Sequence, residues 1–220
     1  MVLALDHADH KIHTRIHVQK NETVNQRIAF FDFDGTITTH DTLLEFIRFS
    51  KGAFLFYLGF LLYSPWLVAY RLKIIPNQLA KEKILGFFFA NTPLADFQSQ
   101  CDRFAVEILP TLLRPKALAE IARLQQAGFV VAVVSASPEN WIAGWAAANG
   151  LLLIATRLDI KEQQLTGRIA GRNCHGKEKV NRIHETFQLT DYKEIYAYGD
   201  SSGDRPMLAL ASISFFKPFR

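Results

Sequence analysis

Five short apolar runs recur along this chain, and segments with helical periodicity lie between most of them. The runs cover residues 28–33, 129–135, 151–156, 195–200 and 213–216. The helical segments cover 116–127, 139–149, 178–187 and 204–211. Strand–helix–strand repeats build parallel sheets, and strands that are apolar along nearly their whole length are covered on both faces. The alternation therefore predicts an α/β fold with a doubly wound parallel sheet.

Two stretches interrupt this alternation. Residues 41–113 are largely helical and strongly apolar, and they are too long for a loop. We expect them to form a helical cap over the strand ends, inserted into a core made of residues 28–40 and 114–220. The second stretch, 157–169, has the alternating pattern of a small β-hairpin.

The first 27 residues are polar and show no sustained apolar period, which predicts a tail. They contain His7, His10, His13 and His17. A helix would place the last three on one face, which would suit a transition metal. A solvated tail is the favoured interpretation, because nothing else in this segment would hold the ligands rigidly.

The composition narrows the set of partners. A net charge of +4 favours anionic partners only weakly. Trp66, Trp141 and Trp145 are not interleaved with a basic stripe, so we interpret them as packing residues and expect no nucleic-acid partner. Cys101 and Cys174 lie far apart, and the chain starts without a signal-like apolar region. We therefore expect a cytoplasmic setting without a disulfide framework.

Residues 52–70 form a stretch of nineteen residues without a charge. The stretch meets the length criterion for a membrane span, but Ser64 and Pro65 near its middle predict two shorter helices joined by a turn. An interfacial hairpin with basic flanks would contact a membrane surface through residues 52–75, which would make the protein peripheral on the inner membrane face. Burial within the cap or against a second subunit is the alternative. A true membrane span is least favoured, because it would separate the cap from the sheet on which it is expected to pack.

Two carboxylates, Asp32 and Asp34, lie at the end of the first apolar run, in the sequence FFDFDGT. Buried carboxylates without a partner are costly, so a compensating cation is expected. Mg²⁺ is the natural candidate, since it binds one or two carboxylates together with phosphate oxygens. A carboxylate can also attack phosphorus and form an aspartyl-phosphate.

Further polar residues follow the other apolar runs. Ser135 closes the run 129–135, where its hydroxyl and the next amide could hold phosphate oxygens. Asp200 and Asp204 form an acidic turn in GDSSGD. Lys177 and Lys179, in HGKEKV, lie at a helix start, where one ammonium could neutralise both the nucleophile and a phosphoryl group.

These four motifs occur along the chain in the order DFDGT, SAS, a lysine and GDSSGD. In this respect the chain resembles the haloacid dehalogenase (HAD) superfamily, and within it the phosphoserine-phosphatase-like branch, subfamily IB, over about residues 28–216. The resemblance implies a HAD-like Rossmannoid core with a helical cap. It also implies a Mg²⁺-dependent phosphomonoester hydrolase that acts through an aspartyl-phosphate. Dehalogenation is disfavoured, because the second Asp of the pair marks the phosphatases and phosphomutases of this family.

The resemblance assigns roles residue by residue. Asp32 looks like the nucleophile and Asp34 like the general acid and base. The KGxx arrangement of phosphoserine phosphatases would make Lys177 the catalytic lysine. The xEKV arrangement of related lipid-linked members would make it Lys179, which we favour. The implied Mg²⁺ ligands are Asp32, the backbone carbonyl of Asp34, and Asp200, with Asp204 supporting the site. The implied phosphate-binding groups are Ser135 and the amides of Gly35 and Ala136.

The substrate is less constrained. Asp41 occupies the position of a Glu that binds the substrate amine in phosphoserine phosphatases. Asp41 could bind an amine in the same way, or it could cap the helix that follows. The apolar, basic cap is similar to that of phosphatidylglycerophosphatase C-like bacterial proteins, which suits a phosphate on a lipid or another amphiphile. A small-metabolite phosphatase, a membrane-binding module that uses the apolar cap, and an oligomer formed through the cap remain alternatives.

Overall fold

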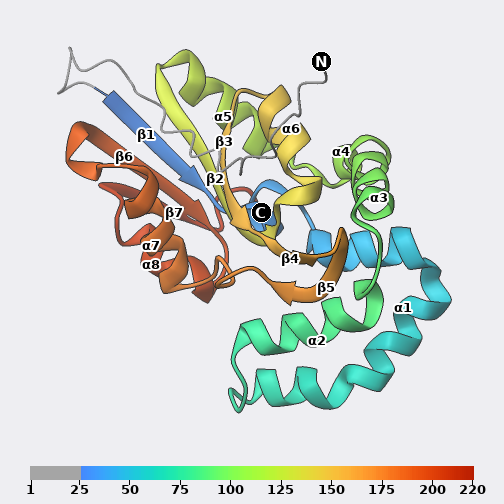
Figure 1. Cartoon of the computed structure of the whole chain (residues 1–220). Helices are drawn as coiled ribbons and strands as arrows, with labels where there is room; N and C mark the ends of the chain where they lie inside the picture. The colour runs from blue at the N-terminus through green and yellow to red at the C-terminus, as the bar shows by residue number, and fades with distance from the viewer. Residues whose placement is uncertain (1–25) are drawn as a thin grey trace, which may run out of the picture.

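The computed structural model describes residues 26–220, and its centre is a five-stranded parallel sheet with strand order β3-β2-β1-β6-β7 (Figure 1). The strands are β1 (Gln26–Phe31), β2 (Phe129–Pro138), β3 (Leu152–Thr156), β6 (Tyr192–Gly199) and β7 (Ile213–Phe216). The predicted doubly wound sheet is confirmed. β1 begins two residues earlier than predicted, so the expected tail is too long by Gln26 and Arg27, and its four histidines lie outside the described residues.

Both faces of the sheet are buried at its centre, where successive side chains of a strand point to opposite faces, whereas the edge strand β7 is mostly exposed. In β1, Ala29 and Phe31 belong to one core cluster, while Ile28 and Phe30 belong to the other. Helices cover both faces, as Figure 1 shows. They are α5 (Pro115–Gln126) and α6 (Ala143–Ala148) on the first cluster, and α7 (Lys177–Thr186) and α8 (Arg205–Leu208) on the second.

Four helices occupy the chain between β1 and α5. They are α1 (Thr42–Arg71), α2 (Asn77–Phe89), α3 (Leu94–Glu107) and α4 (Leu109–Leu112). The helical insertion predicted there is present. At its contact with the core, Phe46 of α1 stacks on the buried Trp141 at a centroid distance of 4.7 Å. Within the insertion, Phe46 meets Phe97 and Phe104 of α3 edge to face.

A two-stranded antiparallel hairpin, β4 (Leu158–Lys161) and β5 (Gln164–Ile169), packs against α2 (Figure 1). The backbones approach closely, because a Cβ added to Gly167 would lie 2.4 Å from the Cα of Gly86. The predicted β-hairpin is therefore present, and it lies against the cap helices.

The expected turn at Ser64 and Pro65 is wrong, because α1 continues through Pro65. Proline lacks the N–H that would bond the carbonyl of Leu61, but the Ser64 hydroxyl donates to that oxygen at 2.8 Å. α1 is interrupted instead at Gly52, whose φ of 78° and ψ of 164° are accessible only to glycine. The turn that leads into α2 follows Arg71.

Candidate active site

The predicted site residues gather where β1, β2 and β6 end. Asp32 follows β1 directly, and its amide donates to the Tyr198 carbonyl of β6 at 2.9 Å, so the strand pairing continues up to the carboxylate. The loop then turns at Gly35, which has a φ of 79°. A Cβ at Gly35 would lie 2.5 Å from Oδ2 of Asp200, so glycine is what lets the two strand ends approach.

A buried lysine links two of the carboxylates. Nζ of Lys179 donates to Oδ1 of Asp32 at 2.6 Å and to Oδ1 of Asp204 at 2.7 Å, and the lysine side chain is only 1% exposed. Lys177, the other candidate, is exposed. Burial acts against the charged form of Lys179, but the negative charges of Asp32 and Asp204 outweigh it and raise its pKa. The lysine is therefore a fixed ammonium between two carboxylates.

One ammonium does not balance this cluster. Burial raises the pKa of Asp32 to about 7 in spite of Lys179, and Asp204 adds to the rise. Carboxylate oxygens of Asp32, Asp200 and Asp204 lie within 4.8 Å of one another. Hard oxygen ligands and excess negative charge are what Mg²⁺ requires, so the donor set fits this ion. Arg220 also pairs with Asp200.

Asp34 lies in a separate hydrogen-bond network, and its side chain is not part of that carboxylate cluster. Oδ1 of Asp34 accepts from the amide and the hydroxyl of Thr42 at 2.7 and 2.6 Å, and Oδ2 accepts from the Ser137 hydroxyl at 2.6 Å. The Trp141 indole donates to the Thr42 hydroxyl at 3.0 Å. The first turn of α1 and the end of β2 thus hold Asp34 in place.

The proposed phosphate-binding residues lie beside this network. Ser135 is fully buried, and its Oγ accepts from the Ser137 amide at 3.0 Å. The Ala136 carbonyl accepts from Nζ of Lys81 at 2.8 Å. The Gly35 amide donates to the Thr38 hydroxyl at 3.3 Å, a long bond that leaves it only weakly engaged.

Asp41 is the N-cap of α1. Its Oδ1 accepts from the amides of Leu43 and Leu44 at 2.9 and 3.3 Å, so the capping alternative is realised in the fold. Although Asp41 keeps solvent exposure, desolvation and then the charge of Asp34 raise its pKa to about 6 against the opposing effect of Lys81. A carboxyl group and an ammonium from the inserted helices thus lie near Asp34.

Four residues of this site were not singled out from the sequence: Thr42, Lys81, Ser137 and Arg220. Trp141 was interpreted only as a packing residue, and it also donates to Thr42. Two of the four had a local signal. Thr42 follows Asp41 at the predicted helix start, and Ser137 is the second serine of the SAS motif. Lys81 had none, because its approach to the site depends on how α2 packs on the core.

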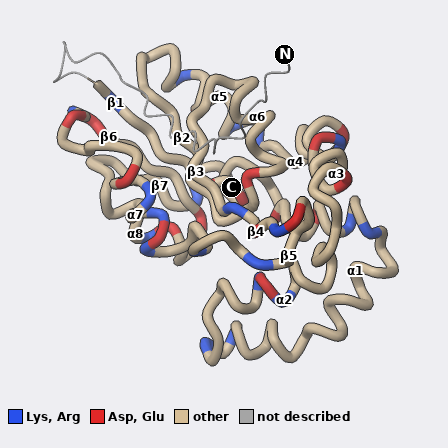
Figure 2. Tube along the Cα trace, in the orientation of Figure 1, with Lys and Arg blue, Asp and Glu red and all other residues tan. Residues whose placement is uncertain are grey.

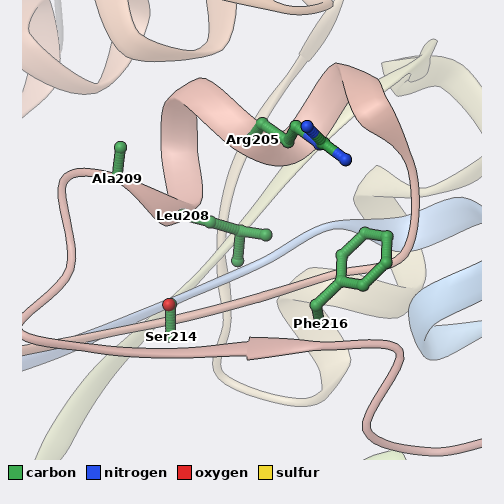
Figure 3. A pocket seen from close by; sticks show the side chains of 5 residues that line it. All are labelled: Arg205, Leu208, Ala209, Ser214 and Phe216. Atoms are coloured by element: carbon green, nitrogen blue, oxygen red, sulfur yellow. The ribbon is translucent and has the colours of Figure 1, made fainter.

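Figure 3 shows a pocket of about 300 Å³ between α8 and β7, lined by Arg205, Leu208, Ala209, Ser214 and Phe216. None of the predicted site residues lines it, and its only charged lining residue is Arg205. We assign it no role in the chemistry.

The fold and the site define a hydrolase built on a Rossmannoid sheet with a helical insertion. The chain belongs to the haloacid dehalogenase-like hydrolase family, whose model matches residues 29–209. The family predicted from the four motifs is confirmed.

The chain is also similar to individual proteins. It is 35% identical to Protein CicA of Caulobacter vibrioides over 195 residues, which cover 88% of this chain and 86% of that protein. A crystal structure of a protein of unknown function from Bordetella pertussis Tohama I has a TM-score of 0.75 and 24% identity, covering 87% and 89% of the two chains. A phospho-aspartyl intermediate analogue of phosphoserine phosphatase has a TM-score of 0.64 and 19% identity, covering 87% and 86%. These two solved structures share the fold of this chain.

Proposed function

We propose that the protein is a Mg²⁺-dependent phosphomonoesterase that forms an aspartyl-phosphate on Asp32. The observation that carries this proposal is that two carboxylates of one loop lie in different environments. Asp32 is held by Lys179 within the acidic cluster, whereas Asp34 is held by hydroxyl groups outside it. One carboxylate is thus placed to form a bond and the other to move a proton.

In the first step, a carboxylate oxygen of Asp32 attacks phosphorus, and the bond from phosphorus to the alcohol oxygen breaks. Asp34 gives its proton to the departing oxygen. In the second step, Asp34 takes a proton from water, the water oxygen bonds to phosphorus, and the bond to Asp32 breaks, which releases inorganic phosphate. The hydroxyls of Thr42 and Ser137 can donate to an ionised Asp34 or accept from the protonated acid, so their network accommodates both states.

Asp32, Asp200 and the backbone carbonyl of Asp34 would hold Mg²⁺, with Asp204 supporting the site through Lys179. When bound, the ion would neutralise charge on the phosphoryl oxygens. Lys179 would add a positive charge near the attacking carboxylate, and Ser135 with the amides of Gly35 and Ala136 would bind the phosphoryl group.

For the substrate we propose a phosphate on a lipid or another amphiphile. Helix α1, whose Thr42 bonds Asp34, and the turn into α2, whose Lys81 reaches the site, expose ten large apolar side chains within residues 54–74. A small phosphorylated amine is the second candidate, because Asp41 and Lys81 could meet the two charges of a zwitterion. The cytoplasmic setting and an oligomer formed through the cap remain predictions.

The test is phosphoenzyme trapping with a radiolabelled phosphomonoester, using Mg²⁺ and chelator as the two arms. We expect an acid-stable, hydroxylamine-sensitive label in the wild type, none in Asp32→Asn, and an accumulated label in Asp34→Asn. Asp96→Asn, an exposed carboxylate on α3, is the matched control. A label that persists in Asp32→Asn would contradict the mechanism. A substrate panel of phosphoserine, phosphatidylglycerophosphate and lysophosphatidic acid then separates the two substrate classes.

A further inference from the structure

The second half of α1 and the turn after it expose an unusual number of large apolar side chains. Ten of the sixteen such side chains exposed in residues 26–220 lie within 54–74. The most exposed define what we call the hairpin surface, and they are 56 to 78% exposed: Phe54, Tyr57, Leu61, Leu62, Val68, Leu72 and Ile74. Scattered apolar residues are ordinary on a protein surface, whereas a contiguous group marks a contact site.

This surface remains uncovered because α1 is apolar around its whole circumference. Helix α2 covers only one side of it, where Gly59 faces Phe88 closely and the Tyr63 and Phe87 rings lie 5.1 Å apart. By length and composition α1 could cross a membrane, with a mean hydropathy of 1.6 over its best eighteen-residue window, yet only 6% of that window is buried. A helix that is apolar all round is normally buried in protein or in lipid.

The charges around the surface are all positive. Between residues 46 and 80 the sequence has four lysine and arginine residues and no acidic residue. Arg71, at the end of α1, and Lys73, in the turn that follows, are exposed and alternate with Leu72 and Ile74. Figure 2 shows basic residues at the tip of the α1–α2 pair, while α2 itself carries residues of both signs. Exposed apolar side chains with basic neighbours match the interface of an anionic bilayer.

A second copy of the chain fits this surface less well. Lys51 and Arg71 flank the apolar stretch at its two ends. Either orientation of a second copy would therefore bring cations together, and the stretch has no carboxylate to pair with them.

The structure also argues against a span. The start of α1 is bonded to Asp34 through Thr42, and α2 is bonded to the core through Gln78, which donates to the Gly171 carbonyl at 3.1 Å and accepts from the Asn173 amide at 3.2 Å. Both helices would have to leave these contacts before α1 could cross a bilayer.

We propose that the hairpin surface docks the protein onto an anionic lipid bilayer, by inserting into the interfacial layer without crossing it. This attachment goes beyond the proposed hydrolysis and holds whether or not the substrate is a lipid. It places the helices that carry Thr42 and Lys81 next to the membrane.

The test is co-flotation of the full chain with vesicles of phosphatidylcholine alone and with vesicles that also contain phosphatidylglycerol, over a series of salt concentrations. We expect binding to the anionic vesicles that weakens as salt rises. Replacing Leu61 and Leu62 together by Ser should abolish binding. Replacing Arg71 by Gln and Lys73 by Asn should weaken binding to the anionic vesicles by about thirtyfold, at about 1 kcal/mol per basic residue.

Two controls match these variants. Val106→Ser alters an apolar side chain that is 77% exposed on α3, and Lys116→Gln with Lys193→Gln removes two exposed lysines elsewhere. Both should bind vesicles like the wild type. Asp32→Asn should also bind normally, which separates failure of docking from failure of the proposed hydrolysis. Circular dichroism of each variant checks that it is folded.

Two results would overturn the proposal. One is a wild-type chain that does not float with anionic vesicles at low salt. The other is a wild-type dimer, measured by light scattering, that dissociates when Leu61 and Leu62 are replaced, together with no binding to vesicles. This result would identify a second copy of the chain as the occupant of the surface.

Discussion

Replacement of Lys179 by Met removes the ammonium that bonds Asp32 and Asp204, and Lys177→Met is its matched control two residues away. Lys179 Nζ lies 2.6 and 2.7 Å from the two carboxylates, and the lysine side chain is 1% exposed. Lys177 is exposed and lies at the first position of α7. The pair of variants therefore separates the effect of the buried charge from that of losing a lysine at the helix start.

The magnitude follows from the burial of the two ion pairs. Each pair contributes about 6 kcal/mol of Coulomb attraction at an effective dielectric constant of about 20, and desolvation offsets much of it. Removing one partner of a buried pair typically costs about 3–5 kcal/mol, because the other charge stays buried without compensation. Here one substitution leaves two carboxylates uncompensated, so we expect the upper end of that range. Lys177→Met should change stability by less than about 0.5 kcal/mol.

The loss of stability in Lys179→Met depends on pH. Burial acts to raise the pKa of Asp204, but the ammonium of Lys179 and hydrogen bonds from Lys179 and Ser201 lower it below its ordinary value. A carboxylate with a depressed pKa in the folded state stabilises the fold above its unfolded pKa, about 4, and that contribution is lost as the pH falls. In Lys179→Met the buried carboxylates can bind protons instead. The stability difference from wild type should therefore be largest near neutral pH and shrink as the pH falls toward about 4.

The assay is urea unfolding of the three proteins at several pH values in the presence of chelator, followed by phosphate release with Mg²⁺. We expect Lys179→Met to lose at least about a hundredfold in turnover, because it removes a fixed charge at the attacking carboxylate. Equal losses in the two variants, or a Lys179→Met protein as stable as wild type at neutral pH, would refute the reasoning.

Three further outcomes follow from the packing. Gly35→Ala should weaken Mg²⁺ binding, measured by calorimetry, because its Cβ would lie 2.5 Å from Oδ2 of Asp200 and its φ is 79°; unchanged binding would contradict this. Gly167→Ala should lower the midpoint of thermal unfolding by several degrees, since its Cβ would lie 2.4 Å from the Cα of Gly86 and overpacking typically costs about 1–3 kcal/mol. Gly144→Ala, whose Cβ would meet nothing within 4 Å, is the control for both glycine variants and should lower neither quantity. Both cysteines are fully buried, and burial raises the pKa of Cys174 to about 11. Neither cysteine should therefore react with a thiol reagent until the protein unfolds. Rapid labelling of the native protein would show that the packing is wrong.

Much of the fold could be predicted because the signals are local. Short apolar runs bounded by turn residues formed the strands of the sheet, although the edge strand β7 is mostly exposed, and the strand–helix alternation restricts the sheet to parallel pairing. The acidic pair after β1 and the acidic turn after β6 could be placed at one edge of the sheet for the same reason, since parallel strands share an edge at their carboxyl ends. The break in α1 was misplaced because a single hydroxyl, Ser64, satisfies the carbonyl that Pro65 leaves free.

The sequence by itself determined the strands, the helical insertion and the candidate carboxylates, because periodicity and motif spacing need no long-range information. Only the tertiary structure decided which lysine meets Asp32. Lys177 and Lys179 both lie in the first turn of α7, and two residues along a helix turn a side chain by about 200°, so packing of the helix on the sheet buries one and exposes the other. The strand order and the approach of Lys81 to Ala136 were likewise decided by contacts between segments far apart in the chain.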